Sequence, residues 1–306
     1  MTKRIITNKI EFEEFMSEID LILREKDIPI PGRTVHALCE AGTKLGIEVL
    51  IAPIKSAPIE GVYEGESLSA HIVKWVQDRY GERLKMDLSI GHALILIRGT
   101  PWLLKFPWMV GSVRMVCERD LSKEFQNFVV YKSGEPHPKP IMNLLLCIRD
   151  LPQSLVNDLS DDELREILDY FLVGNEFFIR TYRFFKDAEL LLSGIRDVKS
   201  SAEYCVDSNS THGLSRWASL QSAEKFLKFY IEQSGEQFPH THDLKRLANQ
   251  AYGLGLPLIE ETVLDHIQCN ASVRYESLQH KTLDVVKAHQ NALMVGVLAM
   301  NTLTEI

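Results

Sequence analysis

The sequence has few cysteines, and none of them lie at short spacing. It contains five, scattered as Cys39, Cys117, Cys147, Cys205 and Cys269. A disulfide framework is expected to use an even number of cysteines and a zinc ribbon uses C-x-x-C pairs, so the sequence indicates neither. We therefore expect reduced thiols and a cytoplasmic protein.

The sequence also lacks a long apolar run and an excess of positive charge. No stretch is continuous enough to span a bilayer and the first residues resemble no signal peptide, so no membrane partner is expected. The 42 acidic residues outnumber the 34 basic ones, which gives a formal net charge of −8. This balance disfavours a chain that coats nucleic acid non-specifically, but a local basic groove is compatible with it.

What the sequence does contain is typical of a folded protein, with 45% hydrophobic and 25% charged residues. Its 306 residues are enough for two domains. We expect the α+β class, with a mixed α/β domain over residues 1–135, a linker with a short helix over 136–158, and an up-and-down helical bundle over 159–306. The proline-dense stretch 135–140 is the expected hinge.

In the first domain, apolar periodicity and β-branched runs predict both helices and strands. The expected helices cover residues 10–25, 33–45 and 67–80. The expected strands are a run at 47–53 and an antiparallel meander of runs at 93–99, 102–108 and 112–117, separated by glycine and proline.

The second half gives only helix signals. Ser160 and Glu163 form a capping-box signature for a helix that an aromatic-rich pattern extends to about residue 192. The polar stretch 200–213 is expected to be a loop. Further helices are expected over residues 214–233, 242–252, 257–267 and 277–303, and their short connections favour antiparallel neighbours.

Three segments of this half resemble the HEPN family, the higher-eukaryote and prokaryote nucleotide-binding domains. They are Ala223-Glu-Lys-Phe-Leu-Lys, then Gly235 with Phe238-Pro-His-Thr-His-Asp-Leu, and Arg274-Tyr275 ahead of a final helix. The resemblance covers about residues 161–306. It implies a small all-α bundle that forms a homodimer and interacts with RNA or nucleotides.

The resemblance also implies a possible catalytic set. Endoribonucleases of this family that need no metal carry an arginine, four to six residues, and a histidine near the start of the last helix, and five residues separate Arg274 from His280. The histidine would move the proton of a ribose 2′-hydroxyl, and the arginine would stabilise the charged phosphorane. Asp284 lies four residues after His280 and would orient its imidazole from the same helix face.

Other features of the sequence point to a binding module instead. Tyr275 stands where the nuclease motif often has another polar residue, and an Arg-Tyr pair is typical of members that bind nucleotides or only dimerise. We expect Tyr275, His242 and Lys287 to be ligand-binding residues, with no cofactor and no metal. A non-catalytic dimerisation or regulatory module is the alternative, in which the polar stripe of the last helix is an ordinary solvated face.

The two histidines of His240-x-His242 could be read as metal ligands. That spacing suits an extended strand, whereas here it precedes a predicted helix. Thr241 as the helix N-cap and Asp243 in the first turn, where the helix dipole favours an acid, explain the segment without a metal.

Overall fold

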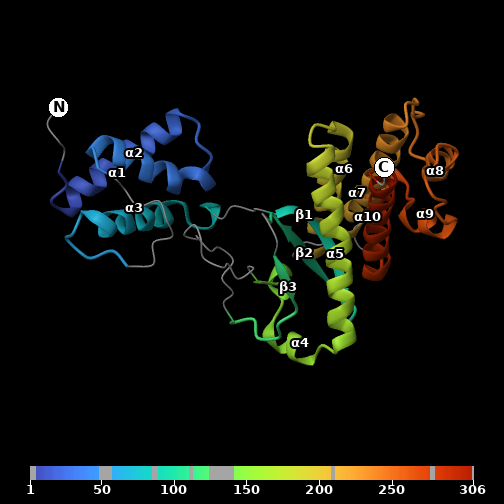
Figure 1. The fold of residues 1–306 in the computed structure, drawn as a ribbon, viewed down its shortest axis with the longest axis horizontal. Helices are drawn as coiled ribbons and strands as arrows, with labels where there is room; N and C mark the ends of the chain where they lie inside the picture. Colours follow the sequence, from blue (N-terminus) through green and yellow to red (C-terminus); the bar gives the residue numbers. More distant parts are fainter. Residues whose placement is uncertain are drawn as a thin grey trace, which may run out of the picture. The chain divides into compact units, whose positions relative to one another are not determined.

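The computed structural model describes residues 5–47, 57–84, 89–109, 113–123, 141–207, 211–275 and 280–304. They form an α+β protein, which confirms the expected class. The chain divides into two compact units, Met1–Asp87 and Leu88–Ile306, whose elements are coloured along the sequence in Figure 1. The expected hinge at 135–140, and all but the first residue of the expected strand at 47–53, lie outside the described residues.

The first unit is helical throughout its described part. Its helices begin and end within two residues of the expected positions: α1 (Lys9–Glu25), α2 (Arg33–Leu45) and α3 (Gly65–Tyr80), with short 3-10 turns η1 (Ile30–Gly32) and η2 (Gly81–Leu84). Apolar residues at helical spacing give each helix one apolar face, and these faces share a core that includes Phe15, Met16 and Ile72.

A buried carboxylate links the three helices of this unit. Asp20 of α1 is 4% exposed. It forms ion pairs with Arg33 of α2 at 3.5 Å and with Arg79 of α3 at 3.1 Å, and the hydroxyl of Tyr80 donates a hydrogen bond to it. A buried charge is tolerated only when it is paired in this way.

The second unit begins with a β-hairpin. Strands β1 (Ser89–Ile97) and β2 (Thr100–Pro107) pair antiparallel, with Ile97 opposite Thr100. Arg98 and Gly99 make the two-residue turn, both with positive φ (48° and 80°), as the tight hairpin turn requires.

The expected meander does not continue beyond this hairpin. Strand β3 (Arg114–Val116) pairs in parallel with β4 (Ile141–Asn143) in a separate two-stranded sheet. The sequence indicates no strand after residue 135, because a three-residue strand is too short to show alternation.

Helices make up the rest of the second unit. They are α4 (Gln153–Asp158), α5 (Asp161–Phe184), α6 (Glu189–Val206), α7 (His212–Gln233), α8 (Leu244–Gly253), α9 (Glu261–Ile267) and α10 (Thr282–Thr304), with 3-10 turns η3 (Leu144–Cys147) and η4 (Ala271–Tyr275). Three expectations are wrong: the helix from Asp161 ends at Phe184 instead of reaching residue 192, residues 200–206 are helical instead of a loop, and the helix expected from residue 257 begins only at Glu261.

Polar side chains of the segment that was expected to be a loop face the interior. Ser201 is fully buried where α6 packs on α7, and its hydroxyl is hydrogen-bonded to other serines there. Small hydroxyl side chains can lie inside a helix pair when their hydrogen bonds are satisfied, so polarity alone misidentifies the segment.

The hairpin packs on the helices of the second unit, so the first 135 residues do not form one domain. Strand β1 contacts α5, α6 and α10, while α7 lies between α6 and α10 (Figure 1). The shared core is rich in phenylalanine, with Phe106, Phe171, Phe177, Phe178 and Phe226 all fully buried. Within the described residues, no helix is both long and apolar enough to cross a membrane.

Candidate functional site

One face of α7 carries a row of large polar and aromatic side chains. Trp217, Gln221, Glu224 and Lys228 recur every three or four residues, which places their side chains in one row along the helix. The row meets the segment before α8 and the turn η4. We call Trp217, Glu224, Lys228, His242, Arg274 and Tyr275 together the Trp217 surface.

Glu224 is the buried centre of this surface, and only 5% of it is exposed. Its carboxylate accepts from Lys228 Nζ at 2.6 Å, from His242 Nδ1 at 2.7 Å and from Gln221 Nε2 at 3.4 Å. A desolvated carboxylate needs such partners, and three donors on two oxygens satisfy it.

The bond to Glu224 fixes the tautomer of His242. A carboxylate paired with an ammonium can only accept, so Nδ1 of His242 carries the hydrogen and Nε2 of the neutral ring has the free lone pair. The His242 side chain is 66% exposed. The buried Glu224 therefore holds the His242 imidazole through Nδ1, and Nε2 takes no part in that hydrogen bond.

The residue after His242 is the N-cap of α8. The carboxylate of Asp243 accepts from the Arg246 amide at 3.2 Å and is the N-cap, while Thr241 accepts from the Asp243 amide at 3.1 Å. Thr241 was the expected cap, but it lies two residues too early to reach the first turn. Among the described residues, no cluster of three or more His, Cys, Asp or Glu could hold a metal ion.

Arg274 lies against two aromatic rings. Its guanidinium carbon is 4.8 Å from the ring centre of Trp217 and 5.6 Å from that of Tyr275, and its Nε donates to the carbonyl of Ala271 at 3.1 Å. Tyr275 is 83% exposed. Such cation–π contacts hold a guanidinium in place without neutralising its charge.

Trp217 connects Arg274 with His242. The imidazole and indole ring centres are 6.1 Å apart, with the planes inclined by 54°. Two predicted site residues, Arg274 and His242, therefore lie against one tryptophan, and a third, Tyr275, lies against Arg274. Trp217 is not among the predicted site residues, and Glu224 and Lys228 are predicted only as members of the HEPN-like segment 223–228, although the helical spacing of the three could have indicated a shared face.

His280 is placed differently. Its carbonyl accepts from Nδ1 of His212 at 3.0 Å, while its own Nε2 is closed to solvent and has no hydrogen-bond partner among the described residues. No described contact joins His280 to Arg274 or Asp284. A general base must reach the proton that it abstracts, and in this conformation the Nε2 of His280 reaches no solvent.

Asp284 and Lys287 are exposed at the start of α10. Neither side chain has a partner in the described part of the chain. The other side of this helix is packed, with Val285, His289 and Leu293 buried. The positions of Asp284 and Lys287 are those of an ordinary solvated helix face.

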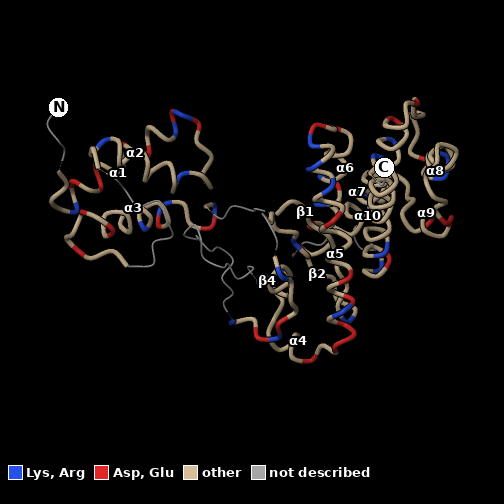
Figure 2. Tube along the Cα trace, viewed as in Figure 1, with Lys and Arg blue, Asp and Glu red and all other residues tan. Residues whose placement is uncertain are grey.

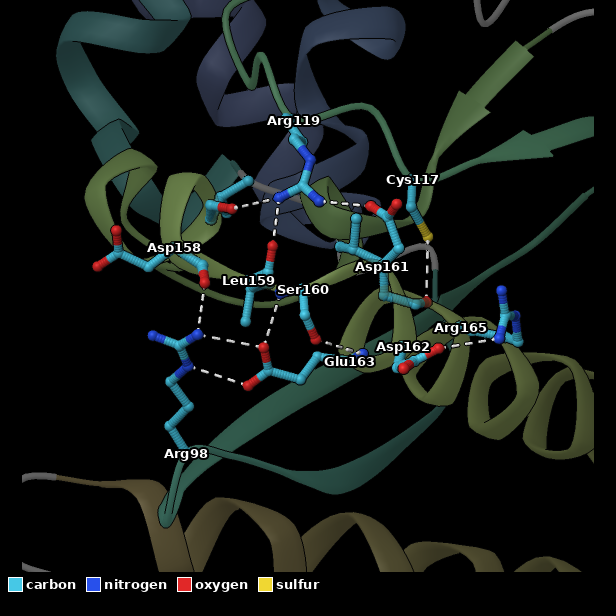
Figure 3. Close-up of polar contacts among 12 residues, drawn as sticks. Arg98, Cys117, Arg119, Asp158, Leu159, Ser160, Asp161, Asp162, Glu163 and Arg165 are labelled. Atoms are coloured by element: carbon cyan, nitrogen blue, oxygen red, sulfur yellow. Dashed lines mark hydrogen bonds and ion pairs between the residues drawn. The ribbon is translucent and has the colours of Figure 1, made fainter.

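A second polar cluster surrounds the start of α5 (Figure 3). The capping box is confirmed: Ser160 Oγ accepts from the Glu163 amide at 3.2 Å, and Glu163 accepts from the Ser160 amide at 2.7 Å. Arg98 donates to Glu163 at 2.9 Å and also to the carbonyl of Asp158, while Arg119 donates to Asp161 at 2.7 Å. The Arg98 guanidinium and the capping amide lower the pKa of Glu163 to about 2.

The charges of this second cluster are matched in pairs. The Arg98–Glu163 pair connects the hairpin turn to the start of α5. A cavity of about 260 Å³ lies beside it, lined by Arg98, Glu163, Glu166, Tyr170 and Gln290 among others. The paired ions leave no free cation for an anionic ligand, which makes the Trp217 surface the better candidate site.

Comparison with known proteins assigns no family to this geometry. No family model matches the chain, and no curated protein or solved structure is significantly similar to it. The HEPN resemblance therefore stays a prediction. The segments on which it depends meet at the Trp217 surface, since Glu224 and Lys228 belong to the first, His242 to the second, and Arg274 and Tyr275 to the third.

Proposed function

We propose that the second unit is a HEPN-like module that binds RNA or a nucleotide at the Trp217 surface. The observation that carries the proposal is the contact of the Arg274 guanidinium with the rings of Trp217 and Tyr275. It presents a positive charge and an exposed aromatic ring side by side. A nucleotide offers the two matching groups, a phosphate for the guanidinium and a base that stacks on the ring.

The charge distribution favours a short ligand. Figure 2 shows Lys and Arg interspersed with Asp and Glu along α5 and α6, without a long basic stripe. At the Trp217 surface, Lys228 is already paired with Glu224, which leaves Arg274 as the cation available for a phosphate. Binding would then depend on base stacking, worth about 1–3 kcal/mol per base, more than on many phosphate contacts.

The proposal concerns binding and does not include cleavage by His280. The expected nuclease set needs Arg274 and His280 at one phosphate and Asp284 beside the imidazole. The Nε2 of His280 is closed to solvent, and no contact in the described structure joins Asp284 to His280 or Arg274. The exposed Arg274 and Tyr275 fit the binding members of the family better.

The alternative, a dimerisation module, has support of its own on α10. Leu283 and Met294 are 46% and 44% exposed and lie eleven residues apart, which places both on one stripe of the helix. Met294→Glu should leave a dimer formed along this stripe monomeric, as light scattering after size exclusion would show. An unchanged mass would remove α10 from the interface.

The test of binding uses fluorescence anisotropy with a short labelled oligoribonucleotide and with labelled ATP. We expect Tyr275→Ala and Arg274→Ala to weaken binding by about tenfold or more, equivalent to about 1.4 kcal/mol. Arg274→Lys should rescue only in part, because an ammonium is a point charge that cannot stack as a plane.

Tyr252 provides a matched control. It is another exposed tyrosine, at the end of α8 and outside the Trp217 surface. Tyr252→Ala should bind like the wild type. Equal binding by wild type and Tyr275→Ala, or equal losses in the Tyr252 and Tyr275 variants, would contradict the proposal.

A further inference from the structure

Three arginines surround one buried carboxylate in the first unit. Asp20 forms ion pairs with Arg24 at 2.6 Å, with Arg79 at 3.1 Å and with Arg33 at 3.5 Å. Among the described residues, no second carboxylate is paired with any of the three arginines. A single arginine would neutralise Asp20, so the four side chains together carry a net charge of +2 that they do not balance among themselves.

Exposure separates the three arginines into two roles. The Arg33 side chain is only 12% exposed, and it also donates to the hydroxyl of Tyr80 and lies 5.0 Å from the centre of that ring. The Arg24 and Arg79 side chains are 52% and 42% exposed. Arg33 therefore helps to hold the buried carboxylate, whereas Arg24 and Arg79 present their positive charges to solvent.

Arg24 and Arg79 lie close together although they belong to different helices. The Nη2 atoms of both contact the same oxygen, Oδ2 of Asp20, so these two nitrogens are no further apart than the two contact distances taken together. Like charges this close repel each other. A second anion bound to the exposed part of the pair would relieve that repulsion.

The Arg79 guanidinium is also held in place from its own helix. Its guanidinium carbon lies 4.9 Å from the ring centre of Trp75, and Nε1 of Trp75 donates to Glu13 at 2.6 Å. Because Asp20 and the indole both restrict it, the Arg79 side chain has little conformational freedom left to lose when a ligand binds. A group that is ordered in advance binds its ligand at a lower entropic cost.

We propose that Arg24 and Arg79 form a binding site for a dianionic phosphate monoester, of the kind carried by a phosphorylated serine. A guanidinium has five N–H donors, and each arginine contacts Asp20 through Nη2, which leaves other donors for a ligand. A phosphate monoester carries close to two negative charges at pH 7, matching the net charge of the cluster, and its three terminal oxygens can accept from both guanidiniums. A carboxylate offers one charge and two oxygens, so it should bind more weakly.

The test measures the fluorescence anisotropy of a rhodamine-labelled peptide of glycine and serine that carries one phosphoserine, with the full chain at low ionic strength. We expect saturable binding that weakens as salt is added, since the two arginines are exposed. The same peptide with unmodified serine or with glutamate at that position should bind at least tenfold more weakly.

Three variants connect the binding to the two arginines. Arg24→Gln and Arg79→Gln should each weaken binding by about tenfold or more, the usual effect of losing hydrogen bonds to a charged group. Lys44→Gln is the matched control, because it removes one positive charge from an exposed side chain at the opposite end of α2 from Arg33. It should bind like the wild type. Asp20 keeps Arg33 in both arginine variants, and equal circular dichroism spectra would show that they are folded.

Inorganic phosphate as a competitor distinguishes the two sources of such a group. Displacement of the labelled peptide by inorganic phosphate at the concentration at which the unlabelled phosphopeptide displaces it would show that free phosphate is a sufficient ligand. Displacement at much higher concentration only would show that the site takes a phosphorylated side chain. Both results agree with the site.

The site lies in the first unit and does not depend on RNA or nucleotide binding at the Trp217 surface, so Arg274→Ala should bind the phosphopeptide like the wild type. Loss of binding in Arg274→Ala alone would overturn the proposed phosphate site and leave the Trp217 surface standing. Absence of binding by the wild type, equal binding of the phosphorylated and unmodified peptides, or equal losses in Lys44→Gln and Arg79→Gln would also overturn it.

Discussion

The backbone N–H of Leu94 donates a hydrogen bond of 2.9 Å to Nε2 of His289 in the interior of the second unit. An amide N–H can only donate, so Nε2 is the acceptor and the hydrogen of the neutral ring lies on Nδ1. That nitrogen is 3.1 Å from the hydroxyl oxygen of Ser201. One imidazole thus joins β1, α6 and α10.

The serines beyond His289 complete the network. Ser215 donates its hydroxyl hydrogen to the carbonyl of Ser201 at 2.8 Å, and Ser219 donates to the carbonyl of Ser215 at 2.9 Å. The hydroxyl hydrogen of Ser201 is then left for Ser219 Oγ, 2.8 Å away. Each hydroxyl hydrogen has an acceptor, which is the condition under which a buried polar network stabilises a core instead of weakening it.

His289 should make the stability of the protein depend on pH. Burial lowers its pKa to about 3, whereas an unfolded histidine titrates near 6.5. Between these values the unfolded chain binds more protons, so the free energy of unfolding falls as the pH drops from about 6.5 toward 3. The loss between pH 7 and pH 5 should be about 2 kcal/mol. Urea unfolding at the two pH values measures it.

The matched variant is His289→Gln, which cannot titrate. It should be less stable than the wild type at pH 7, because the Leu94 amide loses an ideally placed acceptor. Its loss of stability between pH 7 and pH 5 should be smaller by about the same 2 kcal/mol. Parallel pH dependences of the two proteins would show that His289 is not the group responsible.

The sequence was sufficient where structure depends on local patterns. The helices of the first unit and the packed side of α10 follow from apolar periodicity, and the start of α5 follows from Ser160 and Glu163, which interact within one turn. The β1–β2 hairpin likewise shows in two adjacent β-branched and aromatic runs. These are the parts in which the interacting residues are neighbours in the chain.

The sequence was insufficient where distant segments decide the structure. The pairing of β3 with β4 joins two three-residue strands across a long connection. The burial of Ser201 on α6 is explained only by its hydrogen-bond partners on α7 and by His289. The candidate site shows the same division. Arg274 and His242 were recognised as residue types, but the buried Glu224 that orients His242 lies on another helix.

Gly174 illustrates a residue whose role depends on such a distant contact. In the sequence it could be a kink in a long helix, yet α5 runs through it and a Cβ at this position would lie 2.5 Å from the ring of Phe106. Gly174→Ala should therefore destabilise the protein by about 1–3 kcal/mol, the usual result of overpacking a core. Urea or thermal unfolding measures the change.

Gly253 and Phe106 provide the controls. A Cβ at Gly253, the last residue of α8, would meet nothing within 4 Å. Gly253→Ala should be neutral or stabilising by up to about 1 kcal/mol. Combining Gly174→Ala with Phe106→Leu, which removes part of the clashing ring, should cost less than the sum of the single changes. Strict additivity would argue against the contact.

The scattered cysteines should differ widely in reactivity, because burial disfavours the thiolate, which is the nucleophile. Burial raises the pKa of Cys147 to about 12 and that of Cys205 to about 11, and it also raises the pKa of Cys117 and Cys269. Cys39 on α2 is exposed. At pH 8 we expect one thiol to react rapidly with Ellman's reagent and the remaining thiols to react only slowly.

Cys39→Ser should remove the fast phase, and Cys147→Ser should leave it unchanged. Addition of urea should make all the remaining thiols react quickly, because unfolding returns each to its ordinary pKa. Mass spectrometry after brief alkylation of the folded protein should find the label on Cys39. A fast phase that persists in Cys39→Ser would show that one of the four shielded thiols is reached by local opening of the second unit.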